Sequence, residues 1–517
     1  MRIALLQVNT TPGDFSGNIA VIAGQARKAL TASGQPLLCI VPAGALAGFP
    51  WEGLTRREGF YSLCHEAGHR LAEILLEGPD LLMGLPSENG IYYVLLKDGR
   101  MGLVPRTPAG MLRIRGRSIY VPEDDWTRAA QAMSGYVADA VLDMTPRRFV
   151  TEGQAEYETE CAHISRLWNR PVLSVRLWGA TDGLVLSGGS CVFSPSGEIT
   201  ARAPLFEDAI LSFDLDQPDD TGSLVPIPGR EECLFRACVT GIRDYARKCR
   251  LSRAVLGLSG GMDSAMVACM AVKALGAGQV LAVLMPSPWS SDHSLADAKL
   301  LARHLGITAC TIPIQTMMDA FSSALALPQR DIPSAAPEAE DMVMENIQPR
   351  IRGTLLMAFA NHAGAFVLGT GNKSENAVGY CTLYGDTVGA IEPIGDIYKT
   401  ELYAVARWYN QSEGREIIPE NIFAKAPSAE LRPDQKDEDS LPPYEILDAI
   451  LRQLFEERRS PENIHVPGCD KATLHSVLRK IETAEFKRHQ TPPPLRLSSC
   501  TMGYEWRMAA SAKILLP

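Results

Sequence analysis

The chain has 517 residues, of which 46% are hydrophobic and 21% charged, so it is long enough for two or more globular domains. Its formal net charge of −10 argues against general nucleic-acid binding, which needs a basic surface. No apolar run reaches the roughly 18 residues of a membrane span, and the twelve scattered cysteines are typical of reduced thiols in a cytoplasm. We therefore expect a cytoplasmic protein that binds neither nucleic acid nor membranes.

The N-terminal part alternates short apolar runs with helical patterns, which predicts α/β layers. The predicted strands are Ile3–Val8, Leu37–Val41, Leu81–Leu85, Tyr92–Leu96, Val172–Val175 and Ser190–Phe193, and the predicted helix is Ala20–Ala32. Residues 213–232 are dense in Pro, Asp and Gly and lack apolar periodicity, as linkers do. The predicted domains are therefore residues 1–216 and 233–517, joined by residues 217–232.

A zinc-site pattern lies inside the first domain. His65-Glu66-Ala67-Gly68-His69 spells HExxH, which can set two histidines on one helix face. We expect Gly68 to interrupt this helix, and no third ligand is evident. The segment is interpreted as a solvated helix face.

The C-terminal part shows strands separated by helix-length patterns, which predicts a parallel, doubly wound sheet. The strands are Ala254–Leu258, Val280–Met285 and Phe366–Gly369, and the helices are Ala265–Leu275 and Ser294–Leu305. Two stretches without periodicity, Leu327–Asp341 and Lys425–Asp439, are interpreted as either solvated linkers or lids.

A glycine-rich turn, Ser259-Gly260-Gly261-Met262-Asp263-Ser264, follows the first of these strands and opens a helix. Its glycines let the backbone approach an oxyanion, and the helix N-terminus supplies unpaired amides and a positive dipole. Ser259 and Ser264 add hydroxyl donors, and Asp263 is placed to hold Mg²⁺ beside phosphates. The motif resembles the pyrophosphate loop of the ATP pyrophosphatase family, which cleaves ATP between its α and β phosphates and adenylates a substrate.

The same residues admit a second interpretation. Gly257-Leu258-Ser259-Gly260-Gly261 also spells the GxSxG nucleophile elbow of hydrolases. A hydrolase needs a histidine and an acid later in the chain, and the histidines downstream lie in no recognisable context. The phosphate loop is therefore the preferred interpretation.

Further motifs follow in order along the C-terminal part. They are Met285-Pro286-Ser287, Ser290–Ser294, Glu345–Arg352, Thr370–Glu375, Tyr384-Gly385-Asp386, Asp396–Thr400, Pro427–Leu431, Asp434–Asp437, Leu441–Tyr444 and Lys487–Gln490. This series closely resembles the synthetase domain of glutamine-dependent NAD synthetases and covers nearly all of residues 233–507. These enzymes use ATP and Mg²⁺ to amidate the nicotinate carboxylate of deamido-NAD.

The resemblance implies a role for each matching residue. The ATP site would be formed by Gly257, Leu258, Ser259, Gly260, Gly261, Met262, Asp263, Ser264 and Thr370. The deamido-NAD site would be formed by Asn346, Arg350, Glu375, Tyr380 and Lys487. Asp263 and Glu375 would hold Mg²⁺, and Asp263, Glu375 and Lys399 would be catalytic. Arg352 and Lys425 are further candidates for phosphate or carboxylate contacts, although each lone cation could instead form a surface ion pair.

The first domain more loosely resembles the nitrilase-like glutaminase domain that is fused to such synthetases. Such domains hydrolyse glutamine with a Glu base, a Lys and a Cys nucleophile. Here the expected Glu is Ala43, Pro122 stands at the place of the Cys, and the stretch that should carry the Lys is shortened around Arg100–Leu112. Neither a methyl group nor a proline ring can replace a thiolate, so the domain is predicted to be a pseudo-glutaminase.

The nitrogen donor is therefore expected to be free ammonia. The alternative is glutamine, used through an unrecognised nucleophile or a partner glutaminase. Cys39 and Cys191 lie in apolar runs, whereas Cys161 lies in a more polar helical stretch and is the first candidate for such a nucleophile. A remoter alternative is a non-catalytic nucleotide-binding regulator, and the resemblance further implies a homo-oligomer, at least a dimer.

Overall fold

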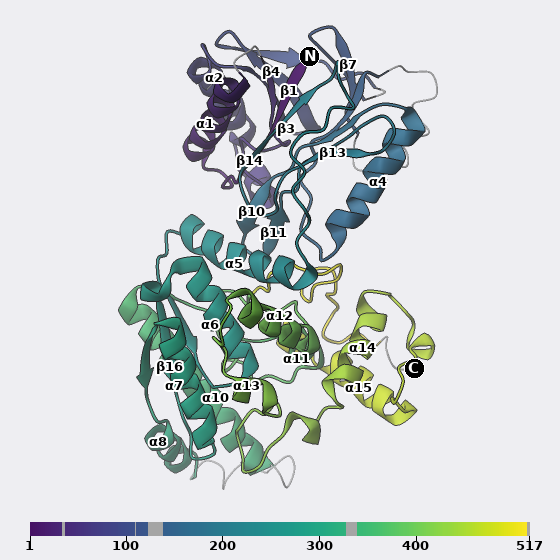
Figure 1. Cartoon of the computed structure of the whole chain (residues 1–517). Helices are drawn as coiled ribbons and strands as arrows, with labels where there is room; N and C mark the ends of the chain where they lie inside the picture. The colour runs from purple at the N-terminus through teal and green to yellow at the C-terminus, as the bar shows by residue number, and fades with distance from the viewer. Residues whose placement is uncertain (34–36, 109, 123–137, 327–338, 514–517) are drawn as a thin grey trace. The chain divides into compact units, whose positions relative to one another are not determined.

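The computed structural model describes residues 1–33, 37–108, 110–122, 138–326 and 339–513. The chain divides into two compact units, Met1–Pro228 and Gly229–Pro517 (Figure 1). Within the described residues, no helix is both long enough and apolar enough to cross a membrane.

The first unit is built from two six-stranded sheets. One sheet has the order β14-β1-β2-β3-β4-β5, with the strands β1 (Arg2–Gln7), β2 (Leu38–Ile40), β3 (Asp80–Ser87), β4 (Gly90–Lys97), β5 (Arg100–Val104) and β14 (Ala209–Asp214). The other has the order β13-β12-β9-β8-β7-β6, with β6 (Met111–Ile114), β7 (Arg117–Tyr120), β8 (Ala140–Asp143), β9 (Val172–Ser174), β12 (Cys191–Phe193) and β13 (Ile199–Arg202). A separate hairpin joins β10 (Trp178–Thr181) to β11 (Leu184–Ser187).

The sheets of the first unit face each other and carry helices on their outer faces (Figure 1). The helices are α1 (Phe15–Ser33), η1 (Glu52–Arg56), α2 (Phe60–Ile74) and α4 (Gly153–Trp168). Strand β1 shows how the sequence specifies this arrangement. Ile3 and Leu5 pack between the sheets, whereas Ala4 and Leu6 pack under α1 and α2, so both faces of the strand are apolar.

The second unit is a parallel sheet with the strand order β17-β16-β15-β18 and helices on both faces. Its strands are β15 (Ala254–Gly257), β16 (Val280–Leu284), β17 (Thr308–Thr311) and β18 (Phe366–Val367). Its helices are α5 (Arg230–Lys248), α6 (Met262–Leu275), η2 (Ala277–Gln279), α7 (Asp292–Leu305), α8 (Gln315–Leu325), α10 (Ala339–Ala363), α11 (Lys373–Val378), α12 (Lys399–Ser412), α13 (Glu420–Ala424), η3 (Asp437–Asp439), α14 (Tyr444–Phe455), η4 (Pro461–Asn463), α15 (Lys471–Thr483) and α16 (Glu485–Arg488).

The strand order of this sheet determines where a ligand can bind. The chain passes from β15 to β16 on one side and later returns to β18 on the other side of β15. In open parallel sheets, ligands bind outside the carboxyl ends of the strands at such a switch point. The glycine-rich turn begins at the carboxyl end of β15, and Thr370 follows β18.

The predicted α/β fold class is confirmed, with a layered first unit and a doubly wound second unit. Every strand and helix predicted from apolar periodicity is present, with ends shifted by a few residues. Strand β17 was missed because Thr308–Thr311 has no apolar run and lies mostly exposed at the sheet edge. Of the first predicted loop, Leu327–Asp341, residues 327–338 lie outside the described residues, and residues 339–341 belong to helix α10 instead of a loop. The second, Lys425–Asp439, is irregular except for the single turn η3.

Candidate active site

The glycine-rich turn forms a concave cradle at the start of α6. Gly260 has a φ of +84°, and a Cβ atom at this position would lie 2.2 Å from the backbone oxygen of Ser294. Only glycine therefore allows α7 to approach the turn so closely. Gly261 is the N-cap of α6 and makes no side-chain cap, which leaves the first amides of the helix to bind an anion.

A cavity of about 290 Å³ opens beside this cradle. Its walls include the whole predicted ATP set, Gly257–Ser264 and Thr370, together with Glu375, Tyr380 and Lys399. Arg352 and Lys425 also line it, as does much of the Lys425–Asp439 segment. Sequence positions more than a hundred residues apart thus share one cavity.

Three predicted catalytic side chains meet inside the cavity. The Lys399 Nζ lies 2.6 Å from the Asp263 Oδ2 and 2.9 Å from the Glu375 Oε1. Burial lowers the pKa of Lys399, but the two carboxylates outweigh it and raise that pKa overall, so the ammonium stays charged. Burial raises the pKa of Glu375 to about 7, against the attraction of Lys399.

Two further side chains, to which the sequence analysis assigned no role, contact the cluster of Asp263, Lys399 and Glu375. The Asn372 Nδ2 donates to the Asp263 Oδ1 at 2.9 Å, while the Asn372 Oδ1 caps α11 by accepting from the Glu375 amide. The Tyr444 hydroxyl lies 3.3 Å from the Glu375 Oε1 and donates to the Asp437 Oδ2 at 2.8 Å. Asn372 was recognisable as an N-cap residue, whereas the contacts of Tyr444 depend on tertiary structure.

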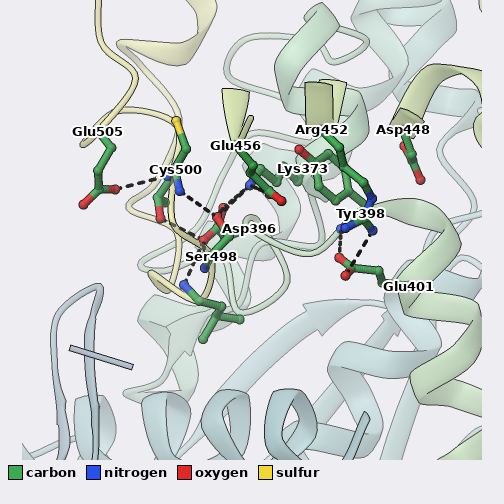
Figure 2. Close-up of polar contacts among 12 residues, drawn as sticks. Lys373, Asp396, Tyr398, Glu401, Asp448, Arg452, Glu456, Ser498, Cys500 and Glu505 are labelled. Carbon is green, nitrogen blue, oxygen red and sulfur yellow. Dashed lines mark hydrogen bonds and ion pairs between the residues drawn. The ribbon is translucent and has the colours of Figure 1, made fainter. Parts of the chain in front are cut away.

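A buried polar network fixes α11, the helix that carries Glu375 (Figure 2). Lys373 is fully buried, and its Nζ lies 3.1 Å from the Asp396 Oδ1 and 3.0 Å from the Glu456 Oε1. Asp396 in turn accepts hydrogen bonds from the amides of Leu497 and Ser498. The network anchors α11 to the end of α14 and to the C-terminal segment, so the Glu375 backbone is held in place.

The remaining predicted deamido-NAD residues gather around one segment, residues 379–384. The Lys487 Nζ donates to the carbonyl oxygens of Gly379 and Cys381, each at 2.7 Å. The Asn346 Oδ1 accepts from the Thr382 hydroxyl, and the Arg350 Nε donates to the Leu383 carbonyl. These three side chains do not line the cavity themselves, but the segment they hold contributes Tyr380 and Cys381 to its wall.

Asp263 and Glu375 fit the expected magnesium ion in one specific way. Within the described residues, no group of three or more His, Cys, Asp or Glu side chains could hold a metal alone. Magnesium in nucleotide sites commonly uses one or two carboxylates together with substrate phosphates. Asp263 and Glu375 flank the Lys399 ammonium beside the phosphate cradle, and two carboxylates in this position suit an ion that is bound jointly with ATP.

The positions predicted for the glutaminase base and nucleophile lie at the ends of two strands of the first unit. Ala43 follows β2 and donates its amide to the Met144 carbonyl, and Pro122 is buried after β7. The residues after Pro122 in the predicted nucleophile segment, 123–126, lie outside the described residues. Tyr120 at the end of β7 pairs in parallel with Val141 of β8, the strand that ends at Asp143.

A buried ion pair occupies this end of the strands. Asp143 is fully buried, pairs with Arg176 at 3.1 Å and accepts a hydrogen bond from the Tyr157 hydroxyl at 2.8 Å. The Arg176 guanidinium also stacks 3.9 Å from the centre of the Tyr157 ring. Arginine does not deprotonate, so Arg176 cannot act as the missing Lys. Burial raises the pKa of Asp143, but Arg176 and Arg147 outweigh it and lower that pKa overall, which makes this carboxylate a weak base.

The four cysteines of the first unit are buried. Cys39, Cys64, Cys161 and Cys191 are all 0% exposed. Burial raises the pKa of Cys39 to about 12 and that of Cys64 to about 11, so both stay protonated thiols. Cys161 lies in a polar helix, α4, as expected, but its side chain is buried in the core with Cys191.

The two other sequence patterns are also decided by the structure. Helix α2 continues through Gly68, contrary to expectation, because the missing side chain lets Met101 pack against the helix. His65 and His69 are exposed, which confirms the solvated face. Ser259 of the GxSxG pattern contacts Ser264 and the Gly261 amide, and no histidine among the described residues hydrogen-bonds to it.

Comparison with known proteins identifies the family. The NAD synthase family model matches residues 234–491. The glutamine-dependent NAD(+) synthetase of Thermotoga maritima is 35% identical over 100% of this chain and 99% of that protein. The chain belongs to the glutamine-dependent NAD synthetases. The relative from Synechocystis is 44% identical over 68% of this chain, and the chain matches 62% of that protein's length.

Solved structures of the family agree with this assignment. The glutamine-dependent NAD+ synthetase of Acinetobacter baumannii in complex with ADP is 28% identical, with a TM-score of 0.73 over 98% of this chain and 97% of that chain. The synthetase of Cytophaga hutchinsonii has a TM-score of 0.81 over 99% and 98% of the two chains, and its 19% identity supports the fold alone. The family predicted from the motif series is therefore confirmed. The expectation of free ammonia as donor is not supported, since the relatives are named for glutamine.

Proposed function

We propose that this NAD synthetase family member converts deamido-NAD to NAD by ATP-dependent amidation through an acyl-adenylate. One observation carries the proposal: the phosphate cradle opens into the cavity that contains the Asp263–Lys399–Glu375 trio. A pyrophosphate-binding loop beside two carboxylates and a fixed cation suits nucleotidyl transfer.

The reaction follows from the poor reactivity of a carboxylate. A carboxylate oxygen of deamido-NAD attacks the α-phosphorus of ATP, and the bond to the β-phosphate oxygen breaks to release pyrophosphate. Ammonia then attacks the acyl carbon, and the bond to AMP breaks. Mg²⁺, when bound with ATP, would neutralise charge on the leaving pyrophosphate.

Each group of residues has a part in this scheme. The amides of the Gly257–Ser264 turn bind the phosphates, and Asp263 and Glu375 would hold Mg²⁺ when it is bound with ATP. Lys399 supplies a buried positive charge that needs no reorganisation during the reaction. Thr370 contacts ATP, and residues 379–384, held by Asn346, Arg350 and Lys487, position deamido-NAD.

The test is product analysis with the purified full-length chain. With ATP, Mg²⁺, deamido-NAD and ammonium chloride, the expected products are NAD, AMP and pyrophosphate in equal amounts. A non-catalytic nucleotide-binding regulator would bind the ligands and form none of these. An enzyme that adenylates another acid would release pyrophosphate only with that acid, which contradicts the proposal.

The nitrogen donor has a second candidate with specific support. The relatives are glutamine-dependent by name, which favours glutamine over free ammonia. The residues Ala43 and Pro122 and the buried thiols of the first unit argue against glutamine hydrolysis by this chain. We infer that glutamine serves through a partner glutaminase, which releases ammonia for the synthetase site.

The donor experiment compares two nitrogen sources with the pure chain. Ammonium chloride is expected to support NAD formation, whereas ammonia-free glutamine is expected to work only after a glutaminase is added. Glutamate release by the pure chain, abolished by a thiol-alkylating glutamine analogue, would show instead that an unrecognised cysteine in this chain hydrolyses glutamine. The expected homo-oligomer and the cytoplasmic location remain predictions.

A further inference from the structure

Glu392 is a buried carboxyl group that has no role in the reaction proposed above. It lines the active-site cavity and is 1% exposed. Its Oε2 accepts a hydrogen bond from the Asn376 Nδ2 at 2.8 Å. Its Oε1 is buried and has no hydrogen-bond partner among the described residues. An acceptor left unpaired in this way is costly, so a ligand that donates to it is expected.

The position of Oε1 relates it to the proposed ATP contacts. It lies 3.0 Å from the point where a Cβ atom on Gly371 would stand, directly beside the turn that carries Thr370. Asn376, which holds the other oxygen, belongs to the same helix as Glu375. The free oxygen therefore lies between the turn after β18 and the helix that carries a proposed metal ligand.

The surroundings of Glu392 favour a small cation. No Lys or Arg within the described ranges forms an ion pair with it. Burial raises the pKa of Glu392 to about 8, against the hydrogen bond from Asn376, and the nearby Asp386 and Glu375 add to the rise. A cation would stabilise the ionised form of Glu392, and a compact donor such as ammonium matches its unpaired oxygen.

We propose that Glu392 binds ammonium in the active-site cavity and accepts its proton before the nitrogen attacks. This inference rests on the proposed amidation. Ammonium has no lone pair and cannot attack an acyl carbon. When one N–H bond breaks, the proton forms an O–H bond at the Glu392 Oε1, and the electron pair stays on nitrogen as the nucleophile.

Other ligands that donate to the Glu392 Oε1 would change a different property of the enzyme. A hydroxyl or amino group of ATP could donate to the same oxygen, and so could a group of deamido-NAD. In those cases Glu392 would determine the affinity for the nucleotide and not for the nitrogen source.

The experiment compares Glu392→Gln with wild type, using ammonium and hydroxylamine as nucleophiles. Hydroxylamine is uncharged at pH 8 and needs no deprotonation before attack. We expect kcat/KM for ammonium to fall roughly a hundredfold, while the hydroxylamine value and the KM values for ATP and deamido-NAD change by less than about threefold. Glu392→Asp, which keeps a carboxylate, should recover part of the ammonium reaction.

The matched control is Glu420→Gln, since this side chain is 69% exposed and lies outside the cavity. The control should behave as wild type with both nucleophiles. An equal fall for both nucleophiles in Glu392→Gln, or a raised KM for ATP or deamido-NAD alone, would overturn the inference. Failure of wild type to release pyrophosphate with deamido-NAD would instead reject the proposed function, so the two failures are distinguishable.

Discussion

Replacement of Lys399 by methionine tests whether the active-site lysine stabilises the protein through its charge or through its packing. The substitution keeps an unbranched side chain and removes the ammonium that lies between Asp263 and Glu375. The Lys399 side chain is 5% exposed, while the two carboxylates are 20% and 19% exposed. Removing one partner of a buried pair costs roughly 3–5 kcal/mol, and partial exposure of the carboxylates places this case near the lower end.

The loss of unfolding free energy in Lys399→Met should increase with pH. The attraction of Lys399 lowers the pKa of Glu375, so the variant carries a pKa for this group above the value of about 7 in wild type. A carboxyl whose pKa is higher in the folded than in the unfolded state loses stability as pH rises through the folded value. The difference in unfolding free energy between wild type and variant should therefore be large at pH 8.5 and small at pH 5.5.

Thermal unfolding at these two pH values measures the effect. A loss of 3 kcal/mol corresponds to roughly 6–12 °C in Tm for a domain of this size. Lys273→Met is the matched control, because Lys273 is 42% exposed and its pair with Glu413 lies on the surface, where such pairs contribute about 0–1 kcal/mol. Equal losses at both pH values, or an equal loss in Lys273→Met, would refute the electrostatic explanation.

Three further substitutions test the site residues. Asp263→Asn should abolish pyrophosphate release, because it removes a proposed metal ligand, and should also lower Tm, because it breaks the buried pair with Lys399; near wild-type release would reject the assigned role. Gly260→Ala should lower both Tm and ATP affinity in thermal-shift titrations, since its Cβ would collide with the Ser294 backbone and its φ is positive; unchanged ATP affinity would count against the cradle. Lys487→Ala should weaken deamido-NAD binding more than ATP binding, because it frees the carbonyls of Gly379 and Cys381; equal losses in calorimetric titrations would contradict this.

Local sequence patterns predicted most of the strands and helices. Strand β15, the turn through Gly260 and the start of α6 are contiguous, so apolar periodicity and turn chemistry sufficed. Strand β17 lacks that signal because it is an exposed edge. The continuation of α2 through Gly68 was not predicted, because glycine has a poor helix propensity, but the packing of Met101 against Gly68 stabilises the helix.

The candidate site was predicted only where a motif could be matched. Asp263 and Lys399 lie 136 positions apart, and nothing in their local sequence shows that they touch; the family resemblance supplied both. Lys487 was placed at the dinucleotide, yet the structure shows that its ammonium contacts backbone carbonyls. Glu392 belongs to no motif, and only its burial and its unpaired oxygen identify it.

An isotope experiment tests the central claim, formation of an acyl-adenylate, most directly. Deamido-NAD labelled with ¹⁸O in the nicotinate carboxylate is turned over with ATP, Mg²⁺ and ammonium, and the products are analysed by mass spectrometry. Attack of the carboxylate on the α-phosphorus predicts that one labelled oxygen appears in AMP and none in pyrophosphate. Labelled inorganic phosphate with ADP as the other product, or unlabelled AMP, would contradict adenylation at this site.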